Sequence, residues 1–125
     1  MIDFKNGSVF KLKQVKGDSV EKDIVPLLIE GEQIIGAYKG VRDYVVFTNK
    51  RLISVNVQGM TGKKKDFTTL PYSKIQAFSV ETAGHFDLDS ELDLFYSGLG
   101  HVRLEFSGAS DIVKIGKSIS AYILQ

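Results

Sequence analysis

Hydrophobic and polar residues alternate in short segments along most of the chain from residue 32 onward. The segments cover residues 32–39, 43–48, 51–57, 65–70, 75–82, 91–96 and 101–107. Glycine, asparagine and proline separate them, and β-branched and aromatic residues are frequent inside them. A period of two bounded by such turn residues predicts β-strands. Seven short strands at this spacing predict a meandering antiparallel sheet, which closes into a barrel or folds as two packed sheets.

A helical period precedes the strands. Asp18 and Glu21 fit a capping box, in which the Asp18 carboxylate accepts a free backbone N–H of the first turn. Pro26 interrupts the helical pattern because it has no N–H group to donate. We therefore expect a short helix over residues 19–25, followed by a second turn that has Pro26 at its first position. The apolar residues of this region share one helical face: Val20, Ile24, Leu27 and Leu28.

A second helical period ends the chain. Ser110 or Asp111 is its expected N-cap, and Lys114 and Lys117 occupy its polar face. This helix has to bury its apolar face, and we expect it to cover one open end of the barrel. The apolar stripe consists of Ile112, Ile115, Ile119 and Ile123, with Tyr122 beside them.

Length and composition fit one small domain. The 125 residues are 43% apolar, which is enough for one core without a disulfide or a metal. There is no cysteine, so disulfides, thiolate zinc sites and thiol nucleophiles are excluded. We expect residues 1–17 to form a leader whose structure the sequence leaves open, with Val9, Phe10 and Leu12 as a candidate short strand after the Asn6-Gly7 turn, and residues 18–125 to form the domain. With no apolar run near the ~20 residues of a spanning helix and no secretory signal, we expect a cytoplasmic protein, with a membrane-peripheral position left open.

Several runs together resemble the bacterial pleckstrin-homology (PH) domain family. They are FTNKRLI (47–53), GMTGKKK (59–65), LPYSKI (70–75), FSVETAG (78–84) and DLDSELDL (87–94). The resemblance covers about residues 18–125 and implies a mainly β fold (α+β by count). The implied fold is a seven-stranded, partly open antiparallel barrel with a C-terminal helix cap and a short N-terminal helix. The resemblance also implies closed homo-oligomeric rings, with a pentamer as the expected size, and no enzymatic activity or cofactor.

The lysine-rich loop at residues 59–65 superficially suggests a phosphate-binding P-loop. A P-loop needs four residues between its first glycine and the Gly-Lys pair, and a following helix; here only two intervene, and a strand follows. A glycine-rich hairpin with solvated lysines is the better interpretation. Its Lys63, Lys64 and Lys65 would join Lys39 and Arg42 in binding anionic headgroups only if both loops face the same way. Each such residue contributes about 1 kcal/mol near an anionic surface.

Acidic residues alternate with apolar ones over residues 85–93. A calcium loop that starts at Asp87 would need glycine and glutamate where Leu92 and Gly98 stand, so a metal site is not expected. We interpret the segment as a strand with one buried and one wet face. Its acidic side chains are candidates for a subunit interface. The full set of interface candidates is Phe67, Thr69, Asp87, Asp89, Glu91 and Asp93.

Catalysis and nucleic-acid binding find little support in the sequence. His85 and His101 are the only histidines, and neither lies near a recognisable catalytic motif. The basic residues are balanced by acidic ones to a net charge of +1, and no basic strand with interleaved aromatic residues is present. We therefore predict no enzyme, no metal site and no nucleic-acid partner.

Three binding functions remain. The leading hypothesis is self-assembly, because an incompletely closed barrel leaves strand edges whose N–H and C=O groups can pair with a neighbouring copy. The strands at 65–70 and 91–96 are candidates for that contact. The alternatives are peripheral binding to anionic membrane headgroups, and a peptide-binding adaptor that uses the groove between the strand at 75–82 and the C-terminal helix.

Overall fold

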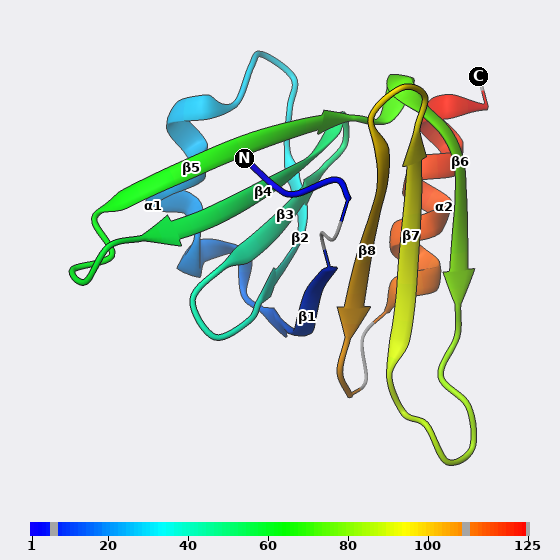
Figure 1. Cartoon of the computed structure of the whole chain (residues 1–125). Helices are drawn as coiled ribbons and strands as arrows, with labels where there is room; N and C mark the ends of the chain where they lie inside the picture. The colour runs from blue at the N-terminus through cyan, green and yellow to red at the C-terminus, as the bar shows by residue number, and fades with distance from the viewer. Residues whose placement is uncertain (6–7, 109–110, 125) are drawn as a thin grey trace.

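The structure is a computed structural model that describes residues 1–5, 8–108 and 111–124. In this part of the chain one long, curved sheet surrounds the core, and a helix lies on each of two sides (Figure 1). The strands are β1 Ser8–Val15, β2 Ile34–Lys39, β3 Tyr44–Thr48, β4 Arg51–Gln58, β5 Lys64–Pro71, β6 Ile75–Glu81, β7 Ser90–Tyr96 and β8 Gly100–Phe106. The helices are α1 Glu21–Ile24 and α2 Ile112–Ile123, and the 3-10 turns are η1 Gly17–Ser19, η2 Val25–Leu27 and η3 Tyr72–Lys74.

The sheet confirms the seven predicted strands and adds an eighth. Its order is β5-β4-β3-β2-β1-β8-β7-β6, so two antiparallel meanders are joined by β1. Strand β1 pairs antiparallel with β2 and parallel with β8, so the sheet is not antiparallel throughout as expected. The sheet curls but does not close, and β5 and β6 are its edges. The partly open PH-like barrel is thus confirmed, with residues 8–15 of the expected leader as the strand that links its two halves.

In the half of the sheet formed by β2–β5, the central strands are covered on both faces. Inside the barrel, Tyr38 packs edge-to-face on Phe47 and Phe106, with centroids 5.8 and 4.8 Å away. On the outer face a second core lies under the N-terminal helical turns, where Val20 and Ile24 are buried. Strand β3 has all five residues buried, which explains why its sequence YVVFT is continuously hydrophobic rather than alternating.

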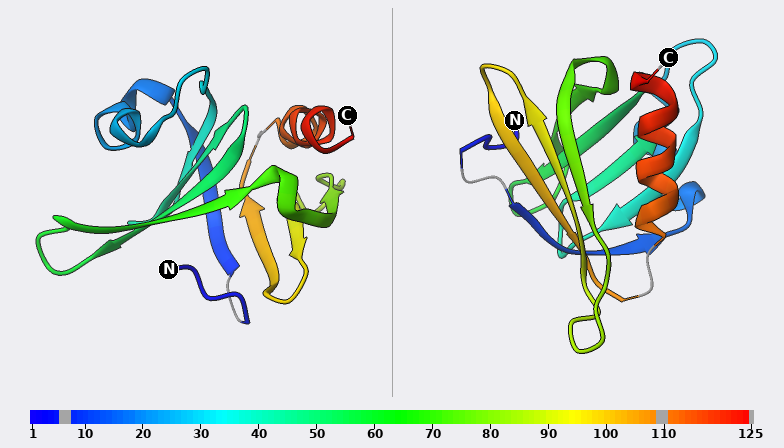
Figure 2. Two further views of the ribbon diagram at one scale, coloured as in Figure 1. Left: turned by 90° about the horizontal axis from the view of Figure 1, so that it is seen from above. Right: turned by 90° about the vertical axis from the view of Figure 1, so that its right-hand side faces the viewer.

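The two openings of the barrel are covered by opposite ends of the chain (Figure 2). Helix α2 buries Ile112, Ile115 and Ile119, as the isoleucine stripe predicts. Asp111 is the N-cap, since its Oδ1 accepts from the Lys114 N–H at 3.2 Å; the alternative cap, Ser110, lies outside the described residues.

Residues 1–5 lie between β5 and the turn that joins β7 to β8. The Ile2 N–H donates to Thr68 Oγ1 on β5 at 3.2 Å, and Ile2 is buried in the main core. Phe4 meets the ring of Tyr96 edge-to-face, with centroids 6.5 Å apart. At Gly100, which has a φ of +120°, a Cβ atom would lie 2.9 Å from the Phe4 carbonyl oxygen. Gly100 therefore permits both the backbone conformation and the close approach of this segment.

The predicted capping box is wrong. Asp18 lies inside η1, and neither η1 nor α1 has a side-chain cap hydrogen bond. Because η1 runs directly into α1, backbone carbonyls already accept N–H groups of the first turns that a cap would satisfy: the Val20 N–H donates to the Gly17 carbonyl, and the Asp23 N–H donates to the Val20 carbonyl. The α-helix is shorter than the expected 19–25, and Pro26 occupies the second position of the turn that follows it.

Candidate functional site

The ends of two hairpins meet at one side of the sheet. The β2–β3 turn contains Arg42, whose guanidinium donates to the carbonyl oxygen of Gly59 in the β4–β5 turn. The two basic loops therefore face the same way, which is the condition on which the predicted anion site depends. The contact ties the loops together across the outer end of β4.

A hollow of about 500 Å³ lies beside this contact, between the hairpins and the N-terminal helical turns. It is lined by three of the five predicted basic residues, Lys39, Arg42 and Lys65, together with the polar groups of Ser19 and Tyr44. The other two, Lys63 and Lys64, do not line it and are exposed at the hairpin end. The lining offers cationic and hydroxyl donors, which suit an anionic group with several oxygen atoms.

One carboxylate offsets part of this positive charge. The Lys65 Nζ and the Tyr44 Oη both donate to Asp23 Oδ2, each at 2.9 Å. The hydrogen bond from Lys65, followed by that from Tyr44, lowers the pKa of Asp23, while burial raises the pKa of Tyr44 above its usual range. Lys65 thus has an internal partner. Among the cations that line the hollow, Lys39 and Arg42 are the exposed ones.

The nearby Asp43 carboxylate fastens the hairpin end. Its Oδ1 accepts from the Val57 N–H at 2.8 Å, and its Oδ2 accepts from Asn56 Nδ2 at 3.3 Å. Both donors belong to β4, so this carboxylate holds the β2–β3 turn against the next strand. Asp43 is therefore a structural residue of the hairpin end as well as a negative charge near Arg42.

The expected acidic strand over residues 85–93 is wrong for its first half. Strand β7 begins only at Ser90, and Asp87 and Asp89 lie in the loop after β6. The carboxylate of Asp87 there accepts from the Asp89 N–H at 3.0 Å, a bond typical of turns. Asp93 does lie on the outer face of β7, but only 8% of the residue is exposed. The Arg103 side chain lies against it, with Nε 2.9 Å from Asp93 Oδ1 in an ion pair.

The outer face of β6, β7 and β8 carries a cross-strand row of three glutamates. Glu91 lies directly opposite Glu81 on one side and Glu105 on the other. Burial raises the pKa of Glu91, and so does the negative charge of Glu81, Glu105 and Asp93. The positive charge of Arg103 lowers this pKa but does not outweigh the other effects. Like charges placed opposite one another destabilise a sheet, so this row favours a positively charged partner.

The edge strand β5 exposes a hydrophobic side chain on its outer face. Phe67 is 37% exposed, and Thr69 follows it on the same face. The exposed Leu27 and Ile29 lie close by, because the Arg51 guanidinium donates both to the Leu27 carbonyl at 2.7 Å and to Thr69 Oγ1 at 2.9 Å. Of the two strands named as interface candidates, only β5 is an edge; β7 is paired on both sides and can contribute through its side chains alone.

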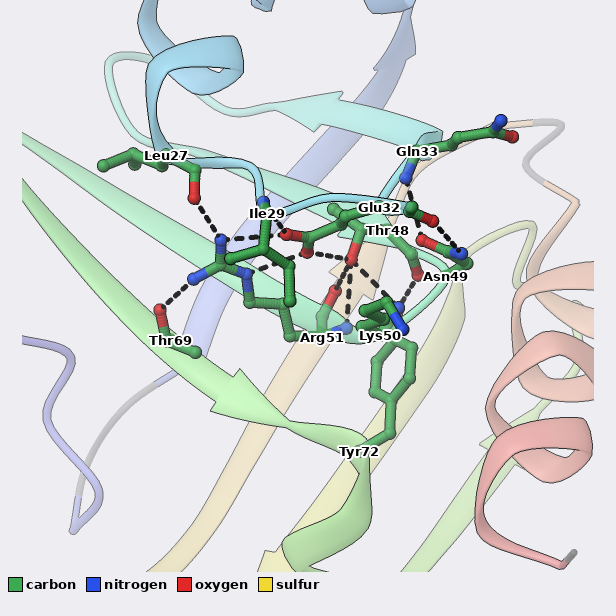
Figure 3. Close-up of polar contacts among 11 residues, drawn as sticks. Leu27, Ile29, Glu32, Gln33, Thr48, Asn49, Lys50, Arg51, Thr69 and Tyr72 are labelled. Carbon is green, nitrogen blue, oxygen red and sulfur yellow. Dashed lines mark hydrogen bonds and ion pairs between the residues drawn. The ribbon is translucent and has the colours of Figure 1, made fainter.

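A buried ion pair, which the sequence did not reveal, supports this edge (Figure 3). Arg51 Nε and Nη2 donate to the two carboxylate oxygens of Glu32, at 2.9 and 3.0 Å. Thr48 Oγ1 donates to Glu32 Oε2 at 2.6 Å, and Tyr72 Oη donates to the Thr48 carbonyl at 2.7 Å. The cluster joins the loop before β2 to the β3–β4 turn and to η3. Its only signal in the sequence is the FTNKRLI run, which places Thr48 and Arg51 on either side of a tight turn.

The two histidines do not form a recognisable catalytic group. His85 contacts the ring of Phe86 in the β6–β7 loop. His101 stacks on Phe95, with centroids 5.0 Å apart, and its Nε2 lies 3.3 Å from Asp93 Oδ1. Within residues 1–5, 8–108 and 111–124, no three acidic or histidine side chains are grouped so that they could hold a metal ion. None of the helices in these ranges is long and apolar enough to cross a membrane.

Helix α2 packs tightly where a peptide groove was expected. A Cβ atom at Gly116 would lie 2.9 Å from Val80 Cγ2 of β6, so helix and strand are in close contact. A hollow of about 330 Å³ lies instead on the other side of α2, where Tyr122 and Ala121 face Ile35 and Asn49.

Comparison with known proteins gives consistent results. The model of the family described as "Bacterial PH domain" matches residues 3–123. The uncharacterized protein YjqA of Bacillus subtilis is 44% identical over 120 residues, which cover 94% of this chain and 96% of YjqA. A DUF1696 family protein with a pleckstrin-homology domain, from Shewanella loihica, superposes with a TM-score of 0.76 at 40% identity, covering 90% of this chain and 97% of that one. A pleckstrin homology domain from Shewanella amazonensis gives a TM-score of 0.65 at 41% identity, with 96% and 94% covered.

Proposed function

Because the chain belongs to the bacterial PH domain family, we propose that it is a non-enzymatic binding module that assembles with copies of itself into a closed ring. The observation that carries this proposal is the open sheet. Strands β5 and β6 end it at opposite sides, and each forms ladder hydrogen bonds with one neighbour only. Unpaired N–H and C=O groups along such an edge pair readily with another strand.

The β5 edge has the character of an interface rather than of a protected edge. Exposed Phe67, Leu27 and Ile29 lie beside it, and burial of such side chains provides the driving force for association. The Glu32–Arg51 pair fixes the loop that carries Leu27 and Ile29, so little order has to be created on binding.

The two free edges differ, so a contact between β5 of one copy and β6 of the next is heterologous. A heterologous contact repeated around an axis closes a ring when its rotation permits closure, and otherwise gives a filament. The ring is the outcome we expect, with a pentamer as the expected size.

Light scattering coupled to size-exclusion chromatography, followed by native mass spectrometry, tests the proposal. We expect a discrete oligomer at micromolar concentration. Phe67→Asp should lower its mass toward the monomer, because a carboxylate would be buried in the contact. Val113→Asp on the exposed face of α2 is the matched control and should leave the mass unchanged. A strictly monomeric wild-type protein under these conditions contradicts the proposal.

The hollow at the hairpin ends favours a second function, binding of an anionic headgroup or another phosphorylated group. Its support is that Lys39, Arg42 and Lys65 line one hollow of about 500 Å³. Cosedimentation with vesicles that contain anionic lipid, compared with neutral vesicles, tests it at low salt. Lys39→Glu with Arg42→Glu should abolish binding, whereas Lys114→Glu with Lys117→Glu on α2 should not. Equal sedimentation with neutral and anionic vesicles, or none with either, counts against this function.

A further inference from the structure

The first residues of strand β2 have a neighbouring strand on one side only. Strand β1 pairs with β2 from Lys13 to Val15, opposite Lys39 to Ala37, and then turns away into η1. Residues 34–36 of β2 extend beyond this end of β1, so within the described part of the chain their one strand partner is β3. An added strand can pair with the N–H and C=O groups on the open side of such a segment.

A β-bulge at Ile35 changes the direction of the side chains in this open segment. Ile34 lies opposite Thr48 and Gly36 lies opposite Phe47, whereas Ile35 has no partner in either ladder. Ile34 packs against the second core under the N-terminal turns, but Ile35 lines a hollow against α2. A Cβ atom at Gly36 would also lie on the α2 side, 3.2 Å from an isoleucine of that helix. Bulges turn side chains in this way and are frequent beside functional sites.

Ile35, which is 37% exposed, lines two hollows. One, of about 530 Å³, lies on the open side of β2, where Lys16 and Gly17 form the facing wall. The other, of about 330 Å³, is bounded by Ala121 and Tyr122 of α2. In the left view of Figure 2, the N-terminal turns and α2 lie on the two sides of the start of β2. We call the two hollows together the β2 groove, which is lined by residues 14–17 and 34–37 and by Asn49, Ser118, Ala121 and Tyr122.

The charge around the β2 groove is positive. Lys16 lines it, and no carboxylate of the described chain does. Among the residues that directly adjoin its lining in the sequence, Lys13, Lys50 and Lys117 are basic and Asp18 alone is acidic. None of these four lysines forms an ion pair within the described ranges. The open backbone fits an extended chain, and the unpaired lysines favour acidic side chains on that chain.

We propose that the β2 groove binds an extended peptide segment of another protein, in which acidic residues flank an apolar side chain. The segment adds to residues 34–36 as a short strand, its apolar side chain lies beside Ile35 against Tyr122, and its carboxylates meet the lysines. The site differs from the groove expected between residues 75–82 and α2, where helix and strand are in close contact. Strand β2 lies inside the sheet, away from the β5 and β6 edges, so the inference does not rest on the proposed assembly.

Selection from a library of random peptides displayed on phage tests the inference without fixing the peptide sequence in advance. The wild-type protein should enrich peptides that combine acidic and β-branched or aromatic residues. A selected peptide labelled with fluorescein then gives the affinity by fluorescence anisotropy. Ala121→Glu places a larger, negative side chain on the α2 wall, and Lys16→Glu reverses the charge of the facing wall; each should weaken binding at least tenfold. N-methylation of alternate peptide N–H groups should have a similar effect in one of its two registers, because a paired strand donates on one side.

Two variants with matched substitutions are the controls. Val113→Glu lies on the exposed face of α2, and Lys64→Glu lies at the β4–β5 hairpin end; both should bind the peptide like the wild type. Failure to enrich any peptide overturns the inference, and so does equal binding of the selected peptides to Ala121→Glu. If Ala121→Glu instead lowers the mass of the oligomer, the groove belongs to a subunit contact and the inference is wrong. A monomeric wild type that binds the peptide contradicts the proposed assembly alone.

Discussion

The Arg51 guanidinium holds both carboxylate oxygens of Glu32, a side chain that is only 1% exposed. The two residues are 19 positions apart, and their contact fixes the loop before β2 against the β3–β4 turn. Two of the remaining guanidinium N–H groups donate to the Leu27 carbonyl and to Thr69 Oγ1 on the edge strand. One arginine therefore connects the N-terminal helical turns, the hairpin and the edge at which we place the subunit contact.

Removal of this arginine should destabilise the protein strongly. Arg51→Met leaves the Glu32 carboxylate buried without its cation, and such a loss costs about 3 kcal/mol of unfolding free energy. Lys65→Met breaks the more exposed pair with Asp23 and should cost at most about 1 kcal/mol. Urea denaturation of both variants at neutral pH measures the difference. Equal losses would show that the Glu32–Arg51 pair has no special structural role.

The same carboxylate predicts loss of stability in acid. Burial alone would raise the pKa of Glu32, but hydrogen bonds from Arg51, Thr48 and the Ile29 N–H outweigh it and hold the pKa below its ordinary value of 4.5. A pKa depressed in the folded state gives stability that is complete above the unfolded value and is lost as pH falls through the folded one. The urea concentration at the unfolding midpoint should therefore decrease as the pH is lowered below about 4.5. Glu32→Gln should flatten this dependence, and an unchanged slope would contradict the assignment.

The sequence predicted the sheet well because its strands combine a period of two with turn residues at each end. The seven predicted strands agree with the structure to within two residues at each end. Strand β1 gave only the weak signal of Val9, Phe10 and Leu12, since its partners are β2 and the distant β8, and a parallel partner leaves no local turn signal. The capping box failed for a similar reason: a preceding helical turn, invisible in the spacing of Asp18 and Glu21, already supplied the backbone partners.

The candidate sites were harder to predict than the fold. Lys39, Arg42 and Lys65 converge because two hairpins lie side by side, which their separation in the sequence does not reveal. The alternating pattern places Asp93 on the solvent-facing side of its strand, yet its ion pair with Arg103 across the β7–β8 ladder buries it. The glutamate row appears only once the register of three strands is known.

Gly116 should not tolerate a methyl group. Alanine normally stabilises a helix by about 1 kcal/mol relative to glycine. Here its Cβ would lie 2.9 Å from Val80 Cγ2, and overpacking of this kind typically costs about 1–3 kcal/mol, so Gly116→Ala should be destabilising. Val113→Ala on the exposed face of α2 should change stability by only a few tenths of a kcal/mol. Adding Val80→Ala to Gly116→Ala should recover part of the loss; if it recovers none, the clash is not the cause.

Cysteine cross-linking distinguishes the two ways in which free edges can meet, and it has no background because the chain contains no cysteine. Thr69→Cys labels the exposed outer face of β5, and Ala77→Cys labels that of β6. If β5 of one copy lies beside β6 of the next, a short bismaleimide should link the two variants to each other when they are mixed, and neither to itself. Val113→Cys on α2 should remain unlinked. Efficient linkage of Thr69→Cys to itself would mean that two β5 edges meet around a two-fold axis, a contact that stops at a dimer and contradicts the ring.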